Sequence, residues 1–242
     1  MEVHKLARFQ ATQSRTVAAI ERAALDFLEF YPDLSAETSN ASHLCILVGS
    51  ERGFCGDFND SLIHAVAADT YSGLIAIGSR LINKGPDAMA AIEGASAAEE
   101  VTAVLNRLLD KISALLKTHS LAATSRLTVV YHDNAAGQII HRQILPPFPR
   151  QPQQAPHGYP PLLNLAPADF YADLVHHYLL AVLHEIFYIS LMTENQKRLQ
   201  HLEGAVKHLD DEMLARHRKL QRYRQEEITE EIEVILLNTE NL

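Results

Sequence analysis

HLCILVGSERGFCGDFN, residues 43–59, decides the fold of this chain. Its first part, up to Gly49, is a short apolar run with the composition of a buried strand. The stretch DSLIHAVAADT, which begins at Asp60, is typical of a helix. A glycine-rich turn between a strand and a helix is a common place for a phosphate group to bind. The turn therefore indicates an α/β fold and raises the question of whether it holds a nucleotide.

The glycines of this turn do not have the spacing of a phosphate-binding motif. Gly49, Gly53 and Gly56 are four and three residues apart, and no Lys-Ser or Lys-Thr pair follows them. A Walker loop requires G-x-x-x-x-G-K-[ST], and the dinucleotide fingerprint requires G-x-G-x-x-G. The dinucleotide fold also places an acidic residue after its second strand, where this sequence has Ser79 and Arg80. We therefore expect a structural turn, without a bound nucleotide or other cofactor.

The reactive residue types near the turn do not form a convincing catalytic group. Cys55 and His64 are nine residues apart, and a buried structural cysteine is much commoner than a nucleophilic one. Asp57 is expected to occupy the start of the following helix with its own carboxylate. The thirteen histidines are scattered, without the spacing of a metal site. Catalysis remains an alternative that rests on Cys55 alone.

Bulk properties exclude further classes of function. The 242 residues carry a formal net charge of −9, which argues against broad nucleic-acid binding. Only Cys45 and Cys55 are cysteines, and the polar first residues do not resemble a secretory signal, so a reduced cytosolic compartment is the simplest interpretation. The apolar run YLLAVLHEIFYISLM is interrupted by His184 and Glu185, whereas a membrane span needs about 20 mostly apolar residues. Any association with a membrane is expected to be indirect.

Periodicity divides the chain into an α/β domain flanked by two long helices. The domain, residues 40–165, is expected to be Rossmann-like with a mainly parallel sheet. A loop rich in proline, residues 146–161, ends it. The predicted helices cover 1–30, 97–119 and 168–237; the predicted strands cover 43–49, 73–79, 126–133 and 137–145, the last two forming a hairpin.

The C-terminal helix has a narrow apolar seam that is typical of a coiled coil. Its members are Leu199, Leu202, Val206, Leu209, Met213, Leu220 and Tyr223. The partner expected from this chain is the helix at residues 1–30, giving a long antiparallel coiled coil. The alternative is a single helix folded over its own sheet. Since a 30-residue helix can cover less than half of residues 168–237, four apolar residues are expected to have no helical partner in the chain: Leu209, Met213, Leu220 and Ile228.

Three motifs resemble the γ subunit of F-type ATP synthases. SERGFCGDFN is similar to the family's S-[DE]-R-G-[LF]-C-G-x-[FLY]-N stretch. SLMTENQKRLQHLEGA is similar to SLASExAARMxAMxxA, and LQRYRQEEITEEI is similar to YNKARQAxITQEI. The motifs occur in the family's order along nearly the whole chain. Gly56-Asp57 in place of Gly-Gly, and Leu237-Asn238-Thr239 at the family's Gly-Ala end, suggest a divergent branch, with the alternative sodium-associated synthases as one candidate.

The resemblance implies a non-catalytic rotor subunit, the central stalk. Its partners would be the α and β subunits of the catalytic ring, the ε subunit and the membrane rotor ring of c subunits. Its place would be the cytoplasmic side of the bacterial plasma membrane, as a peripheral component, and it would couple ion translocation to ATP synthesis or hydrolysis at the β subunits. The alternative is a non-catalytic coiled-coil adaptor that uses the same fold outside a synthase.

The resemblance also implies roles for particular residues. By their match to the family's motifs, five residues are expected to contact a β subunit: Arg198, Arg224, Gln225, Thr229 and Glu231. Four residues of the opening turn are expected to be structural: Gly53, Cys55, Gly56 and Asn59.

The first residues resemble an internal part of the family's first helix. No capping residue precedes MEVHKLARFQ, and the family has a further helical segment before the residues that Lys5 and Leu6 resemble. We therefore expect Met1 to be an internal methionine of a longer chain.

Overall fold

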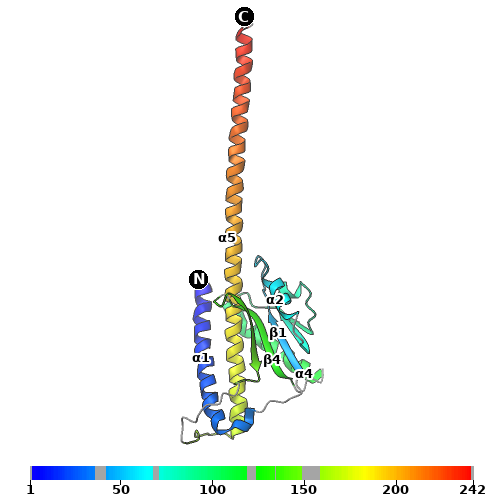
Figure 1. Cartoon of the computed structure of the whole chain (residues 1–242), viewed down its shortest axis with the longest axis vertical. Helices are drawn as coiled ribbons and strands as arrows, with labels where there is room; N and C mark the ends of the chain where they lie inside the picture. Colours follow the sequence, from blue (N-terminus) through cyan, green and yellow to red (C-terminus); the bar gives the residue numbers. More distant parts are fainter. Residues whose placement is uncertain are drawn as a thin grey trace. The chain divides into compact units, whose positions relative to one another are not determined.

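The computed structural model describes residues 2–35, 42–67, 71–118, 124–133, 135–148 and 159–240. The chain consists of two compact units, Met1–Arg198 (unit 1) and Leu199–Leu242 (unit 2). Most of the ten prolines lie in or near the predicted loop 146–161, of which residues 149–158 are outside the described part. The elements are α1 (Glu2–Phe30), η1 (Pro32–Ser35), β1 (Ser42–Val48), α2 (Phe58–Val66), β2 (Gly73–Ile77), α3 (Ser79–Ile82), β3 (Ala90–Ile92), η2 (Ala98–Glu100), α4 (Val101–Thr118), β4 (Thr124–Asp133), β5 (Gln138–Leu145) and α5 (Pro167–Glu240). Figure 1 labels α1, α2, α4, α5, β1 and β4.

The sheet of unit 1 has the strand order β3-β2-β1-β4-β5. All neighbouring pairs are parallel except β4 and β5, which form the predicted antiparallel hairpin. The expected mainly parallel sheet is therefore confirmed. The sequence did not reveal β3 or α3, because three and four residues are too few to show a period.

The strand β1 is buried on both of its faces, which explains its continuous apolar run. Leu44, Ile46 and Val48 belong to a core shared with α1, α4 and α5. The alternate residues Cys45 and Leu47 belong to a second core, on α2. The sheet is thus a middle layer between two sets of helices, and α4 lies on the same side as α1 and α5.

The helix α4 confirms its predicted apolar face. Residues spaced by three and four pack into the core of α1, α4 and α5, as expected for one stripe of an amphipathic helix. They are Val101, Val104, Leu105, Leu108 and Leu115, with Ile112 partly buried beside them.

The helix α1 packs antiparallel against the first part of α5, within unit 1 (Figure 1). Phe27, near the end of α1, lies 4.9 Å from Phe170 between ring centroids. Phe9, near its beginning, lies 5.6 Å from Tyr188. The expected antiparallel pairing of the two terminal helices is therefore confirmed, with residues of α1 facing α5 between about Phe170 and Tyr188.

The expected position of that pairing was wrong. The aromatic contacts of α1 with α5 lie between Phe170 and Tyr188, within unit 1, whereas the seam begins at Leu199, the first residue of unit 2. All seven seam residues are exposed. The related expectation is confirmed, since the residues predicted to have no helical partner are largely exposed: Leu209 (60%), Met213 (69%), Leu220 (48%) and Ile228 (55%).

By length and composition, α5 is the one described helix that could cross a membrane, with a mean hydropathy of 1.4 over its most apolar 18 residues. However, 61% of that stretch is buried inside the structure. Its apolar residues, such as Val182, Ile186 and Phe187, form part of the core with the sheet. The packing of unit 1 therefore accounts for the apolar character of this stretch.

Candidate functional site

The loop after β1 is held in shape by its own polar groups. The amide N–H of Ser50 donates to Asn59 Oδ1 at 2.9 Å, and Asn59 Nδ2 donates back to Ser50 Oγ at 2.9 Å. Asn59 is only 5% exposed, so these bonds satisfy a buried amide. At the tip of the loop, Phe54 has a φ of 64° and Gly56 a φ of 62°. This left-handed backbone is unusual for a side chain as bulky as that of Phe54, which is 68% exposed.

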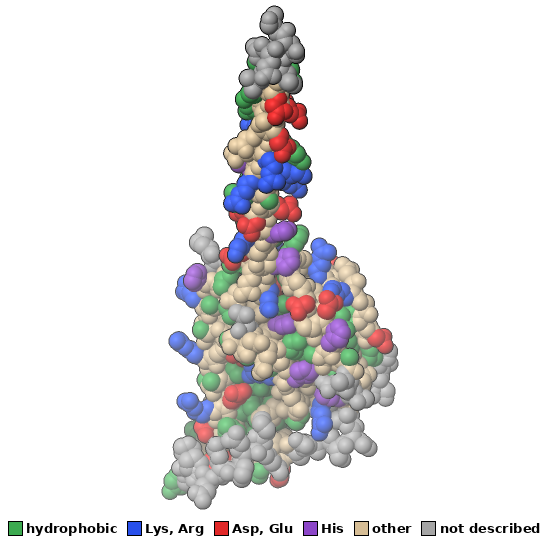
Figure 2. Space-filling view, turned by 45° about the horizontal axis from the view of Figure 1, so that its top comes forward, with side chains coloured by type: hydrophobic (Ala, Val, Ile, Leu, Met, Phe, Trp, Pro, Cys, Tyr) green, Lys and Arg blue, Asp and Glu red, His purple; other side chains and the backbone are tan. Residues whose placement is uncertain are grey.

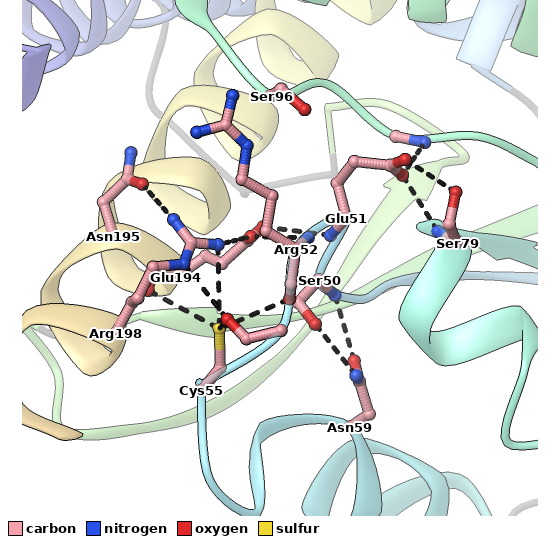
Figure 3. Close-up of polar contacts among 12 residues, drawn as sticks. Ser50, Glu51, Arg52, Cys55, Asn59, Ser79, Ser96, Glu194, Asn195 and Arg198 are labelled. Atoms are coloured by element: carbon pink, nitrogen blue, oxygen red, sulfur yellow. Dashed lines mark hydrogen bonds and ion pairs between the residues drawn. The ribbon is translucent and has the colours of Figure 1, made fainter. Parts of the chain in front are cut away.

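The carboxylate of Glu194, on α5, accepts hydrogen bonds from this loop. The amide N–H groups of Glu51 and Arg52 donate to its Oε2 and Oε1 at 3.2 and 3.0 Å. Two consecutive N–H groups that converge on one anion are a recurrent anion-binding arrangement, and here the anion is part of the protein itself (Figure 3). Glu194 is 3% exposed.

The guanidinium of Arg198, one helical turn after Glu194, also bonds to this loop. Its Nε donates to the carbonyl oxygen of Gly53 at 3.1 Å, and its Nη1 to Asn195 Oδ1 at 2.7 Å. Its Nη2 pairs with Glu194 Oε1 and lies 3.8 Å from Cys55 Sγ. Arg198, which the resemblance associates with a β subunit, therefore has most of its donors directed into its own chain.

A second carboxylate, Glu51, joins the loop to the ends of the neighbouring strands. It accepts from the amide N–H and the hydroxyl of Ser79, after β2, at 2.9 and 2.6 Å. It also accepts from the N–H of Gly94, after β3, at 2.6 Å. A Cβ at Gly94 would lie 3.0 Å from Glu51 Oε2, so the absence of a side chain allows this close approach. The carboxyl ends of three parallel strands are thus linked through one side chain (Figure 3).

Burial dominates the acid–base properties of this cluster. It raises the pKa of Glu194, although the N–H groups of Arg52 and Glu51 and the charge of Arg198 act in the opposite direction. Burial also raises the pKa of Cys55 above its ordinary value, and the negative charge of Glu194 adds to the effect. The Cys55 thiol is 5% exposed and lies 3.4 Å from the carbonyl oxygen of Gly53. It is therefore a neutral, structural thiol, in contrast to the low-pKa thiolate of a nucleophile.

The geometry also explains why this edge of the sheet is a poor place for a phosphate. In an α/β sheet of this type, ligands bind beyond the carboxyl ends of the strands. Here the carboxylates of Glu51 and Glu194 already occupy N–H donors at that edge, and their charge repels an anion. His64 is directed elsewhere, with Nδ1 2.6 Å from the carbonyl oxygen of Asp60. No group of three His, Cys, Asp or Glu side chains that could hold a metal occurs among the described residues.

The expectation for Asp57 was wrong in one respect. Asp57 is the residue at the N-cap of α2, but its side chain makes no capping hydrogen bond. The local N–H groups are served by backbone carbonyls instead, as in the bond from the Phe58 N–H to the Cys55 oxygen at 3.4 Å.

The remaining residues expected at a β contact lie in unit 2. Arg224, Gln225, Thr229 and Glu231 are all exposed. At 100° per residue they fall within a sector of about 160° of the helix circumference. Ile228, 55% exposed, lies inside this sector. The arrangement is an apolar centre with polar neighbours, as at the middle of many protein interfaces.

Charge changes sign along unit 2. Residues 216–224 contain Arg216, Arg218, Lys219, Arg222 and Arg224, and residues 226–233 contain five glutamates. Figure 2 shows these as a band of Lys and Arg side chains followed by a band of Asp and Glu side chains. Since every described residue from 199 to 235 is exposed, this surface is available to a partner.

Sequence reasoning missed Glu194 and Glu51 as the residues that position the loop. Both occur inside the family-like motifs, but no spacing rule connects residues 143 positions apart. The one local signal was the i,i+4 spacing of Glu194 and Arg198, which favours an ion pair on a helix.

Comparison with known proteins agrees with this geometry. The sequence model of the ATP synthase family matches residues 2–242, and that family is the γ-subunit family. The chain belongs to the ATP synthase γ-subunit family. Members of this family are the non-catalytic central stalk, or rotor, of rotary F-type ATPases. No curated protein sequence matches the chain.

Solved structures of similar fold include chains of mitochondrial ATP synthases. A chain of the Euglena gracilis mitochondrial ATP synthase, in an OSCP/F1/c-ring structure, aligns with a TM-score of 0.55 at 15% identity, covering 97% of this chain and 90% of that one. A chain of the E. gracilis rotor gives a TM-score of 0.52 at 13% identity, with 93% and 98% covered. The Tetrahymena thermophila mitochondrial central stalk/c-ring gives 0.50 at 16% identity, with 83% and 99% covered. At such low identity, the structural likeness establishes the fold alone.

Proposed function

We propose that this subunit is the shaft that couples ion translocation through a membrane rotor ring to ATP synthesis or hydrolysis at β subunits. The observation that carries the proposal is the surface of unit 2. A single helix in which every described residue from 199 to 235 is exposed, apolar positions included, is marginally stable in water. Burial within a ring of partner subunits would remove that apolar surface from water.

We propose that the sector around Ile228 contacts the β subunits. The resemblance assigns this role to Arg224, Gln225, Thr229 and Glu231. The side chain of Thr229 donates to the carbonyl oxygen of Gln225 at 2.8 Å, within its own helix. Arg224, Gln225 and Glu231 are therefore the polar groups of the sector most available to a partner.

Arg198 differs from these four residues because its side chain is mostly engaged within unit 1. Its side chain is 16% exposed, and four of its five N–H groups have partners in unit 1. A contact with a β subunit at this point would therefore involve the remaining Nη1 donor or the loop that Arg198 holds.

The proposed partners are those of the family: the α and β subunits, the ring of c subunits and the ε subunit. The matched structures are a central stalk/c-ring and an OSCP/F1/c-ring assembly, which supports the first two classes of partner. The chain would then be peripheral to a membrane, on the cytoplasmic face of a bacterial plasma membrane. The sodium-associated branch remains a hypothesis about the coupling ion.

Purification of the assembled complex tests the rotor function. Affinity-tagged chain, expressed with α, β and ε subunits of an F-type synthase from the same organism, should copurify one copy of the chain with three of β. Recovery without β subunits, or as a binary complex with an unrelated protein, would favour the adaptor alternative.

A double substitution tests the contact sector. Arg224→Ala with Gln225→Ala should reduce ATP turnover of the complex, because each charged hydrogen bond in a desolvated contact contributes about 1.5–3 kcal/mol. The matched control is Arg216→Ala with Lys219→Ala, which removes two exposed polar side chains from the opposite side of the same helix. Equal turnover in the two double variants would contradict the assignment of the sector.

A further inference from the structure

The packing of α5 in unit 1 ends at a polar connection. Thr193 and Glu194 are 1% and 3% exposed, whereas Leu199 is 56% exposed. Between them, Arg198 is the last residue of unit 1. The apolar core, whose last members on α5 are Leu191 and Met192, therefore stops about two turns before the unit ends. Beyond it, Glu194 and Arg198 bond to the loop after β1.

The connection continues from the loop into the sheet. Glu194 holds the N–H groups of Glu51 and Arg52. The side chain of Glu51 in turn holds the N–H groups of Ser79 and Gly94. One chain of hydrogen bonds thus runs from α5 to the ends of β1, β2 and β3 (Figure 3).

These hydrogen bonds resist rotation of α5 about its own axis, which apolar packing resists only weakly. Apolar burial is non-directional, so a helix can turn slightly about its axis while its apolar contacts are kept. Charge-assisted hydrogen bonds are short, strong and directional. A rotation of α5 at Glu194 would carry the carboxylate sideways and lengthen both N–H bonds at once.

We propose that Glu194 and Arg198 are positioning residues that prevent α5 from rotating about its axis against the sheet and loop of unit 1, so that they turn together. We call this contact the torsional fastening. The inference rests on the proposed rotor function and deepens it, because it assigns the transfer of torque to specific groups. The role is intramolecular: the loop is fixed by its own helix, whether or not a partner touches it.

The test measures torsional stiffness in the assembled complex. A gold rod or bead on unit 1 reports the thermal spread of rotation angles while the catalytic ring, fixed to a surface, is paused between ATP turnovers. Glu194→Gln keeps the shape but removes the charge and one of two acceptor oxygens. The spread should widen about twofold, because the loop then loses one N–H bond and the charge assistance of the other.

Two variants test whether the stiffness comes from the bonds to the loop or from an ion pair alone. Glu212→Gln removes an i,i+4 pair with Arg216 in unit 2 that has the same chemistry but holds no loop, so its spread should equal that of the wild type. The charge-exchanged variant Glu194→Arg with Arg198→Glu restores an ion pair, but it offers no acceptor at the position that receives the N–H groups. Its spread should stay as wide as that of Glu194→Gln.

The outcomes distinguish this inference from the proposed function. A wild-type complex that does not rotate with ATP would overturn the rotor function itself. A rotating wild type with the same spread as Glu194→Gln would overturn the fastening, and so would recovery of stiffness in the charge-exchanged variant. If Glu194→Gln fails to assemble, Arg198→Lys decides by the same measurement, since it keeps the charge but loses the fixed fork of donors to Gly53 and Asn195.

Discussion

Glu194 and Arg52 are 142 residues apart in the chain, yet the amide N–H of Arg52 donates to the Glu194 carboxylate at 3.0 Å. This bond joins the loop after the first strand to the last buried turn of α5. Glu194→Gln should therefore lower the free energy of unfolding of unit 1 by about 1–3 kcal/mol, the usual cost of leaving buried donors unsatisfied. Urea unfolding followed by circular dichroism of the isolated chain measures it. Glu212→Gln, in an exposed pair, should change it by less than about 0.5 kcal/mol; equal effects would contradict the role of the loop.

Cys55 should react slowly with alkylating agents in the folded chain. Burial raises its pKa, with Glu194 contributing, so the thiolate is scarce at pH 8 and the sulfur is 5% exposed. We expect iodoacetamide to modify it at least about tenfold more slowly than in urea. Glu194→Gln should accelerate the reaction, because it removes a negative charge and loosens the loop. Cys45, fully buried in β1, is the internal control in the mass spectrum; modification of Cys55 at the unfolded rate would show that the loop is open.

The sheet could be predicted from the sequence, but the polar cluster on it could not. Runs such as HLCILV and LTVV carry their own signal, because a strand buried on both faces must be apolar throughout. The same local rule found α4. By contrast, Glu51 and Glu194 look like ordinary surface carboxylates in the sequence, and only the fold brings Glu194 to two N–H groups far along the chain. The apolar seam of residues 199–223 was recognised in the sequence, yet its expected pairing with residues 1–30 was misplaced, because periodicity identifies an apolar face without identifying what covers it.

His132 should make the stability of unit 1 depend on pH. Burial lowers its pKa below the ordinary 6.5, while its Nε2 lies 2.8 Å from the carbonyl oxygen of Phe58. A histidine whose pKa is depressed in the folded state is protonated more readily in the unfolded state. Its contribution to stability is therefore present above pH 6.5 and is lost as the pH falls through the folded-state pKa.

The measurement for His132 is urea unfolding between pH 5 and 8. His132→Gln keeps an N–H donor for the Phe58 oxygen but does not titrate, so the loss of stability on acidification should be smaller than in the wild type. His64→Gln, at a more exposed histidine of α2, is the control and should leave the wild-type pH dependence in place. Parallel curves for wild type and His132→Gln would contradict the prediction.

Arg142, on β5, should be far more important to unit 1 than an ordinary surface arginine. Its Nη1 donates to Glu185 Oε2 at 2.7 Å, and Glu185 is only 8% exposed. Burial alone would lower the pKa of Arg142, but the bond and charge of Glu185 raise it on balance. Arg142→Ala would leave the Glu185 carboxylate without its countercharge. Since the arginine side chain is 27% exposed, we expect a cost of about 3 kcal/mol, at the low end for breaking a buried pair.

Two further variants identify the cause of that loss. Arg107→Ala removes a pair with Glu93 whose side chains are 50% and 75% exposed, and should cost less than about 1 kcal/mol. Adding Glu185→Leu to Arg142→Ala should recover part of the stability, because the unpaired charge is then gone. Chemical unfolding of all three variants decides; a double variant less stable than Arg142→Ala would mean that packing, and not charge, accounts for the loss.

Limited proteolysis should begin in unit 2 when the chain is alone. A lone helix has no tertiary contacts to support its hydrogen bonds, so it opens locally with little free energy. Unit 2 offers trypsin six exposed sites: Lys207, Arg216, Arg218, Lys219, Arg222 and Arg224. We expect intact-mass spectrometry to show cleavage at these sites before any cut in α1 or α4, which also contain Lys and Arg. The assembled complex is the control, because burial of unit 2 within a catalytic ring should protect the same six sites. Early cuts in α1 or α4 would contradict the greater stability of unit 1, and unchanged cleavage in the complex would contradict burial of unit 2.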